Sequence, residues 1–166
     1  LDKTRTAMGA RTLRKFVEQP LIDKNEINRR LDAVEELKEQ AISREEIREY
    51  LSPVYDLERL ITKITYGSAN PRDLTAFKSS LEMLPPIRYI LEEMKVPLLQ
   101  EIYEDLDALE DLCDLVTKAI REEPPIAMKE GNIIREGYNE EVDKLRRAKS
   151  DGKDWLAKLE EDEREK

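Results

Sequence analysis

The sequence contains no histidine and only one cysteine, Cys113. Without histidine the chain lacks the usual general base, the Ser-His-Asp and Cys-His arrangements of nucleophilic catalysis, and the commonest metal ligand. A single cysteine excludes an internal disulfide and is typical of a reducing compartment. Because Cys113 lies between Asp111 and Asp114, which disfavour a thiolate, we interpret it as a core thiol. The sequence therefore predicts no catalytic residue and no metal site.

Glycine is also scarce, with five in 166 residues. A phosphate-binding loop needs two glycines at fixed spacing before Lys and Ser or Thr, but Gly152-Lys153 is followed by Asp154, and Arg147 occupies the first glycine position. We therefore predict that this chain binds no cofactor. Long apolar runs are missing too. None approaches the ~18 residues of a membrane span, and no segment resembles a signal peptide, so we expect no membrane contact.

Charge is abundant but unevenly distributed. Charged residues make up 40% of the chain and the net charge is −9. Residues 1–30 carry eight Lys or Arg against four acids, whereas residues 101–123 carry nine acids against two bases. The early basic residues could contact phosphates, or they could pair with the 101–123 region or with a part of a longer protein, and we favour pairing. These residues are Arg5, Arg11, Arg14 and Lys15.

Helix start signals follow one another along most of the chain. Asp23 and Ser43 each precede a Glu by three residues, which is capping-box spacing. Pro53 and Pro97 indicate further starts, and the pair Asn70-Pro71 combines an N-cap with a proline at the first helical position. The apolar stripes that accompany these signals are Ile27, Leu31, Val34 and Leu37; Leu57, Leu60, Ile61 and Ile64; Leu74, Phe77, Leu81 and Leu84; and Leu109, Leu112, Val116 and Ile120.

The pattern changes after Pro124-Pro125. The segment "IAMKEGNIIREG" predicts a short β-hairpin within 126–135, turning at Gly131-Asn132. Asn139 then predicts the cap of a helix that continues to Lys166, about 40 Å long. The fold class predicted is mainly α: a multi-helix core with one short β-hairpin, residues 1–137, and a long projecting C-terminal helix, residues 138–166. Because both ends of the chain fall within helical pattern, we expect a fragment of a longer protein.

The projecting helix carries an apolar stripe along one face. We predict that this stripe is a self-association face, or that the helix folds back on its own core, because large apolar side chains left uncovered by the fragment favour a further contact. Its residues are Val142, Leu145, Trp155, Leu156 and Leu159.

Two heptapeptides are nearly identical, "LDAVEEL" at 31–37 and "LDALEDL" at 106–112. Their flanking sequences do not match. Acidic helices with a leucine stripe converge easily on such strings, so we do not interpret them as an internal repeat.

The stretch "LDKTRTAMGARTLRKFVEQPLIDKNEINRRLDAVEEL" resembles the start of the core, or lever, domain (domain III) of the bacterial DNA mismatch-repair MutS family. The family pattern is LD-x-T-x-T-x-x-G-x-R-x-L-R-x-W-L-x-x-P-L, and Phe16 stands at the tryptophan position, which keeps the aromatic character. The strings "VYDLERLITKITYGSANPRDL" and "IIREGYNEEVDKLR" match two later family segments in order. The matching positions that we take as a structural signature are Thr4, Gly9, Arg11, Leu13, Arg14, Pro20, Leu21, Asn70, Pro71 and Gly137.

The resemblance implies structural roles for this signature. Gly9 would let another backbone or a bulky side chain approach the first helix closely. Arg11 and Arg14 would tie helices together, and Pro20 would end the first helix. The helix from Asn139 would be a lever leading toward a clamp domain that lies beyond this chain.

The resemblance also implies a function. The segment would be a non-catalytic core and lever that couples mismatched-DNA clamping to the ATPase domain of the parent. ATP and Mg would bind elsewhere in that parent. The expected partners are mismatched double-stranded DNA, a second MutS subunit and a MutL-type protein, in the bacterial cytoplasm with nucleoid association through the parent. This chain alone should bind DNA weakly if at all. The alternative is a free-standing helical scaffold for protein interactions.

Overall fold

The computed structural model describes the backbone of residues 2–164 and the side chains of residues 2–152, and it is mainly helical, as predicted. One 3-10 turn, Met128–Glu130, lies between the last two helices. The helices are α1 (Ala7–Glu18), α2 (Lys24–Glu39), α3 (Ala41–Leu51), α4 (Leu57–Thr65), α5 (Pro71–Leu81), α6 (Leu84–Glu92), α7 (Pro97–Asp105), α8 (Glu110–Ala119) and α9 (Glu140–Arg164).

The core consists of two small apolar clusters. Helices α2, α6 and α7 enclose one, made of Ala33, Ile87, Leu91, Met94 and Leu99. Helices α4 and α5 enclose the other, made of Leu60, Phe77 and Leu81, and Leu109 and Cys113 pack against it from the α8 side. Helix α5 lies against α4 and α8 at the second cluster and also meets α6, which belongs to the first, so α5 connects the two clusters.

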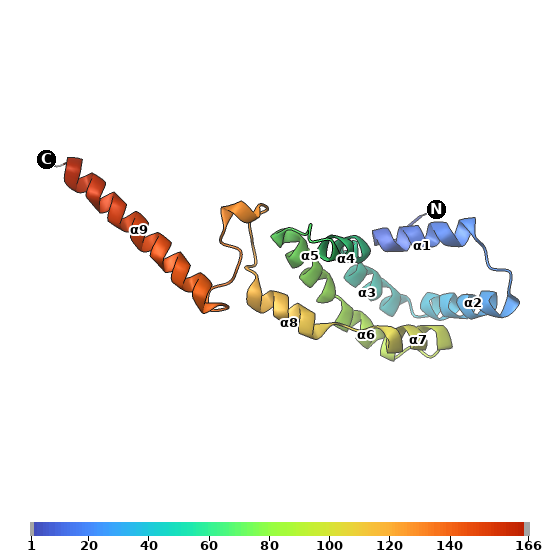
Figure 1. Cartoon of the computed structure of the whole chain (residues 1–166). Coiled ribbons are helices and arrows are strands. Elements are labelled where there is room, and N and C mark those ends of the chain that lie inside the picture. Colours follow the sequence, from blue (N-terminus) through green and yellow to red (C-terminus); the bar gives the residue numbers. More distant parts are fainter. Residues whose placement is uncertain (1, 165–166) are drawn as a thin grey trace.

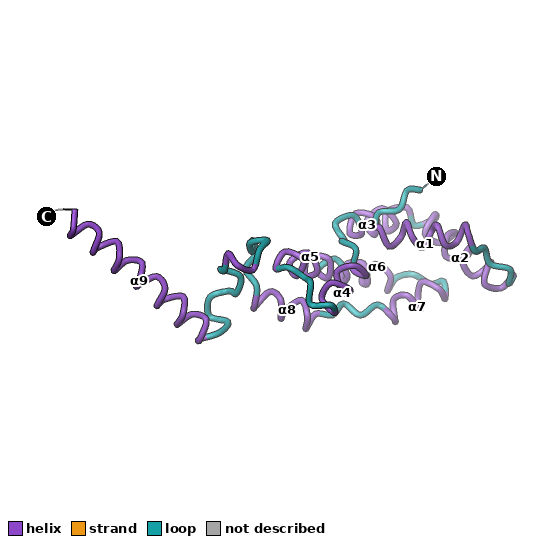
Figure 2. Tube along the Cα trace, turned by 45° about the horizontal axis from the view of Figure 1, so that its top comes forward, coloured by secondary structure: helices purple, strands orange, loops and turns teal. Residues whose placement is uncertain are grey.

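The molecule is elongated. Figure 1 shows α2 to α8 as an extended stack, with α1 along one edge and α9 projecting from the opposite end. The tube view of Figure 2 shows the same separation, so α9 stands apart from the stack in both orientations. Helix α9 begins where Asn139 was expected to cap it, because the Asn139 side chain accepts from the amides of Glu141 and Val142 at 3.0 and 3.1 Å. The proposed division between residues 137 and 138 stays a prediction.

The β-hairpin expected over 126–135 is a wrong prediction. Instead Ile134 pairs with Ile120, upstream of that segment, in an isolated antiparallel bridge. The chain does turn at Gly131 and Asn132, which have φ of 70° and 59°. The residues expected as the first strand form the 3-10 turn Met128–Glu130 instead, so the returning segment finds its partner at the end of α8.

Two helix starts also differ from expectation. Helix α3 begins at Ala41, so Ser43 lies inside it, and α4 begins at Leu57 with Asp56 as its cap rather than at Pro53. The apolar stripe of α2 is less buried than its spacing predicted, whereas Phe77 and Leu81 of the α5 stripe are buried. Leu31 and Val34 are 57% and 60% exposed, whereas Ala33 on the neighbouring face is buried. The buried face of α2 is the one that meets α3 and α7.

Candidate functional site

The described side chains offer no obvious catalytic group. No cluster of three or more His, Cys, Asp or Glu able to hold a metal ion occurs among them. Cys113 is half-buried against the second core cluster, and this burial raises the pKa of its thiol, so the thiolate is disfavoured. None of the helices in the described range is both long and apolar enough to cross a membrane. The contacts that join helices to one another are therefore the features to consider.

Helix α1 is held to α4 by a contact that we call the Arg11 clasp. The Arg11 Nη1 and Nη2 atoms donate to the two carboxylate oxygens of Asp56 at 2.7 and 2.9 Å, and Nη2 also donates to Glu58. This two-pronged geometry is the one for which a guanidinium is suited. The Arg11 hydrogen bonds are the largest cause that lowers the pKa of Asp56 below its ordinary value. Pairing was the favoured expectation for Arg11, but its partners lie in α4, not in 101–123.

A second contact joins α1 to α2. The Arg30 guanidinium lies over the Phe16 ring, with 3.9 Å from Cζ to the ring centroid. Such a cation–π contact contributes about 0.5–1 kcal/mol at an exposed site. Phe16 stands at the position where the family pattern has tryptophan, and its ring keeps the aromatic face that the arginine needs. Helix α1 itself buries no residue, and these are the polar and cation–π contacts that join its described side chains to other helices.

The glycine in α1 faces its own N-terminal cap rather than another helix. A Cβ on Gly9 would lie 3.1 Å from Thr6 Oγ1 and 3.5 Å from Thr4 Cβ. Thr6 caps α1 by accepting from the Gly9 amide at 3.0 Å, and Thr4 donates to Asp2. The close approach implied by the resemblance therefore involves the segment that leads into α1.

The remaining signature residues of this segment lie outside the clasp. Arg14 pairs with Glu18 of its own helix at 3.3 Å and does not tie α1 to another helix within the described side chains. Leu13 lines a shallow cavity of about 280 Å³ on the outer side of α1, together with Val17. Pro20 follows the end of α1 and is exposed, whereas Leu21 is half-buried.

Asn70 and Pro71 occupy the start of α5 in the arrangement that the sequence predicted. The Asn70 side chain accepts from the Asp73 amide at 2.9 Å, and the Asp73 carboxylate accepts from the Asn70 amide at 3.0 Å. Lys63 of α4 adds an ion pair to Asp73 at 2.8 Å. The backbone hydrogen bond from Asn70, followed by Lys63, lowers the pKa of Asp73.

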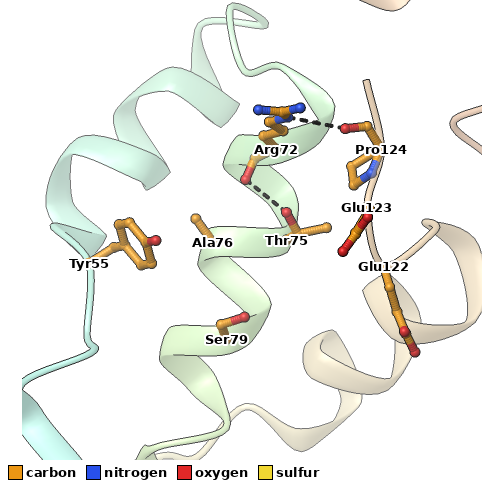
Figure 3. A pocket seen from close by; sticks show the side chains of 8 residues that line it. All are labelled: Tyr55, Arg72, Thr75, Ala76, Ser79, Glu122, Glu123 and Pro124. Carbon is orange, nitrogen blue, oxygen red and sulfur yellow. Dashed lines mark hydrogen bonds between the residues drawn. The ribbon is translucent and has the colours of Figure 1, made fainter. Parts of the chain in front are cut away.

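A cavity of about 430 Å³ opens beside α5 (Figure 3). Arg72 and Pro124 face each other across its rim, where Arg72 Nε donates to the Pro124 carbonyl at 3.2 Å. Glu122 and Glu123 approach from the segment after α8, and Tyr55 lies on the side of α4. The charged groups of the lining are two acids and one base, Arg72, and no feature of the lining identifies a ligand.

The end of α8 and the start of α9 are connected by what we call the α8–α9 joint, made of residues 119–121 and 133–146. Asp143, only 8% exposed, accepts from the Gly137 amide at 2.8 Å and from Arg146 Nη1 at 3.0 Å. Arg146 Nη2 also donates to the Ile134 carbonyl at 2.9 Å. Ile134 forms the bridge to Ile120, flanked by two backbone hydrogen bonds of 3.0 and 2.8 Å.

The sequence drew attention to Gly137 but not to the pairing of Asp143 with Arg146, since the i,i+4 spacing favoured Arg147 as the partner of Asp143. Their only signal was their position in the matched string "IIREGYNEEVDKLR", since an acid and a base three residues apart on a helix normally form a solvated pair. Asp56 and Glu58 were missed in the same way within "VYDLERL". In both cases the important partner lies far away in the sequence or in a loop.

The expected self-association face falls partly outside the described side chains. Leu145 is 72% exposed and Val142 is half-buried. Trp155, Leu156 and Leu159 lie on α9, but their side chains are outside the described residues. The face stays a prediction.

Comparison with known proteins gives one consistent result. A family model described as MutS domain III matches residues 1–165. The chain is 61% identical over 165 residues to the DNA mismatch repair protein MutS of Lachnoclostridium phytofermentans, covering 99% of this chain and 18% of that protein. It is 55% identical over 166 residues to the MutS protein of Caldanaerobacter subterraneus subsp. tengcongensis, covering 100% of this chain and 19% of that protein. The chain thus spans less than a fifth of the length of these curated relatives.

Proposed function

The chain belongs to the MutS domain III family, and we propose from this membership that it is the connecting core and lever of a longer DNA mismatch-repair protein. In this role α1 to α8 form a core that holds neighbouring domains, and α9 is the lever. Mismatched DNA engaged at one end and ATP hydrolysed at the other would influence each other through the segment. Mg and ATP would bind elsewhere in the longer protein.

The observation that carries the proposal is the family match along residues 1–165, joined with relatives that are all named as MutS proteins. The chemistry of the chain agrees with a connecting role. The sequence has no histidine, and the described side chains contain no metal-binding cluster. The match to a segment of larger repair proteins favours this role over the alternative of a free-standing scaffold.

The physical basis for a lever is the length and isolation of α9. Its 25 residues correspond to about 40 Å of helix. A helix of this length is stiff over its whole extent. A small rotation about its base therefore displaces its far end much further than it displaces the residues near the base. The joint at its base leads to α8, which packs on α5 within the core. Motion of the core can thereby reach a domain at the far end of α9.

Interrupting the lever in the full-length protein tests this role. Ser150 is exposed within α9, and Ser150→Pro breaks the helix at a cost of about 3 kcal/mol relative to alanine, whereas Ser150→Ala preserves it. We expect Ser150→Pro to lose the difference in ATP turnover between matched and mismatched duplexes, with basal turnover changed less than about twofold. A Ser150→Pro protein that keeps the wild-type difference would contradict the proposal, and Ser150→Ala should keep it.

The partners follow from the same proposal. We propose mismatched double-stranded DNA, a second MutS subunit and a MutL-type protein as partners of the longer protein. The isolated chain, with a net charge of −9, should bind duplex DNA weakly and with strong dependence on salt. Titrating the chain and the full-length protein with matched and mismatched duplexes checks this, and a several-fold mismatch preference of the chain alone would contradict it.

A further inference from the structure

The α8–α9 joint concentrates the connection between core and α9 on a few groups. Figures 1 and 2 both show α9 leaving the stack of helices at its first turn and running away from it. The direction of the helix is therefore set where it begins. Of the described side chains at that point, Asp143 and Arg146 are the two that lie on α9 and bind the preceding segment.

The two side chains act as one unit. One nitrogen of the Arg146 guanidinium, Nη1, donates to the Asp143 carboxylate, and the other, Nη2, donates to the Ile134 carbonyl. One oxygen of the Asp143 carboxylate accepts from Arg146, and the other accepts from the Gly137 amide. Asp143 is 8% exposed. Without Arg146 a nearly buried carboxylate would lose the one charged partner that it has among the described side chains, which is unfavourable. Loss of the pair would therefore also weaken the contact with Gly137 and Ile134.

The backbone next to this pair is suited to a pivot. Gly137 has a φ of 85°, a left-handed conformation that favours glycine, and the short segment 136–139 separates the bridge residue Ile134 from the first turn of α9. A few loop residues at the start of a helix can absorb a change in φ and ψ that reorients that helix.

We propose that the Asp143–Arg146 pair is a latch that fixes the direction of α9 relative to α8, and that α9 pivots about residues 136–139 when the pair opens. The inference rests on the proposed function only in identifying α9 as a lever. The latch itself is a statement about the two helices and can be tested without DNA or nucleotide.

The test measures the distance between α8 and α9 in the full-length protein. Cysteines introduced at the exposed positions Asp111 and Lys149 carry spin labels, with the native cysteines, including Cys113, replaced by alanine. Pulsed electron resonance then gives the distance distribution for the wild type, for Arg146→Gln and for Asp143→Asn. The control is Arg147→Gln, which removes the same charge from the next residue of α9, an exposed position.

The latch predicts a broadened or shifted distribution in both Arg146→Gln and Asp143→Asn and an unchanged one in Arg147→Gln. Hydrogen exchange of the Gly137 amide should rise by about tenfold or more in the first two variants, since that amide donates to Asp143. A lysine at position 146 can donate to one of these acceptors but lacks the two-pronged geometry that reaches both. The distance distribution and the exchange rate of Arg146→Lys should therefore lie between those of the wild type and Arg146→Gln. Retained circular dichroism in each variant shows that the core remains folded.

Distributions that match the wild type in both Arg146→Gln and Asp143→Asn would overturn the latch, and so would an equal change in Arg147→Gln. The distances are read in the absence of DNA and ATP, so this result is independent of the Ser150→Pro experiment. If the distance measurements support the latch but Ser150→Pro keeps the wild-type mismatch response, only the lever role is rejected. If the distance measurements contradict the latch and Ser150→Pro loses the mismatch response, only the latch is rejected.

Discussion

Arg11 and Asp56, 45 residues apart in the sequence, join α1 to the first turn of α4 through two hydrogen bonds of 2.7 and 2.9 Å. The same Asp56 carboxylate also accepts from the Arg59 amide at 3.3 Å and so caps α4. One side chain therefore serves both the start of α4 and the attachment of α1. The two contributions can be separated by choosing substitutions that remove one or both.

The first prediction separates the two contributions of Asp56, the N-cap of α4 and the Arg11 clasp. Asp56→Asn keeps a good N-cap but loses the ion pair with Arg11, whereas Asp56→Ala loses both. We expect Asp56→Ala to be less stable than Asp56→Asn by about 1 kcal/mol, the usual contribution of a cap. Urea unfolding monitored by circular dichroism measures this difference. Equal midpoints for the two variants would show that the Asp56 cap contributes nothing.

The second prediction concerns acid. The pKa of Asp73 is lowered below its ordinary value of 3.8, first by the Asn70 amide and then by Lys63. A carboxylate with a lowered folded-state pKa stabilises the fold above the ordinary pKa, and this stabilisation is lost as the pH falls through the lowered value. We expect stability to decrease below pH 3.8 and the decrease to be smaller in Asp73→Asn. Urea midpoints between about pH 2 and pH 6 measure it. The exposed Asp32→Asn is the control, and an equal decrease in all three proteins would refute the assignment.

The third prediction compares neighbouring serines. Ser80 is completely buried, and its hydroxyl accepts from the Tyr55 amide at 3.0 Å and donates to the Ala76 carbonyl at 2.8 Å. Ser80→Ala leaves the Tyr55 amide without a partner in the described structure, so we expect a loss of about 1–3 kcal/mol. Ser79→Ala changes an exposed hydroxyl on the same helix and should change stability by less than about 0.5 kcal/mol. Indistinguishable unfolding curves for the two variants would contradict this.

The start of α5 shows what the sequence can predict about this fold. Asn70, Pro71 and Asp73 lie within four residues, and the capping box that they form needs no information from elsewhere in the chain. The cap of α9 at Asn139 and the broad helical content were predicted for the same reason. The signals at Ser43 and Pro53 were equally local but misleading, because α3 has already begun before Ser43, after Gln40, and α4 begins only after Asp56.

Distant contacts explain what the sequence did not predict. The Glu36 carboxylate accepts from the Lys95 and Val96 amides at 2.8 and 2.9 Å, so α2 caps α7 from 60 residues away. Val96 offers no side-chain oxygen of its own, and the sequence near α7 gives no indication of the cap. The Arg11 clasp and the α8–α9 joint belong to the same class, since each depends on how the helices pack.

The fourth prediction tests that distant cap. Glu36→Ala removes the acceptor for two amides at the start of α7 and should destabilise the chain by about 1–2 kcal/mol. Glu35→Ala changes an exposed acid of the same helix and should have little effect. Equilibrium unfolding measures both variants. If Glu36→Ala unfolds at the wild-type midpoint, the distant cap is not a stabilising contact.

The two similar heptapeptides show how packing overrides local pattern. Residues 31–37 lie wholly within α2, whereas residues 106–112 span the loop that follows α7 and the first turn of α8. Leu109 in the second string has a φ of 50°, which a helix does not permit. Two nearly identical sequences thus form a continuous helix in one place and the boundary of a helix in the other. The structure agrees with the interpretation that they are not a repeat.

The last prediction concerns the apolar stripe of α9. Leu145 is 72% exposed, and α9 stands apart from the other helices, so that side chain gains little from burial within the chain. Each large apolar side chain that becomes covered contributes about 1.5–3 kcal/mol, and several together exceed the cost of a weak association at millimolar concentration. We therefore expect the chain of residues 1–166 to self-associate weakly through the face that includes Leu145 and Trp155. Sedimentation equilibrium of the wild type, Leu145→Glu and Trp155→Glu measures this, and Ser150→Glu, which adds the same charge at an exposed position on the opposite face of α9, is the control. A wild type that stays monomeric at millimolar concentration, or glutamate variants that associate as strongly as it does, would show that the stripe does not mediate association.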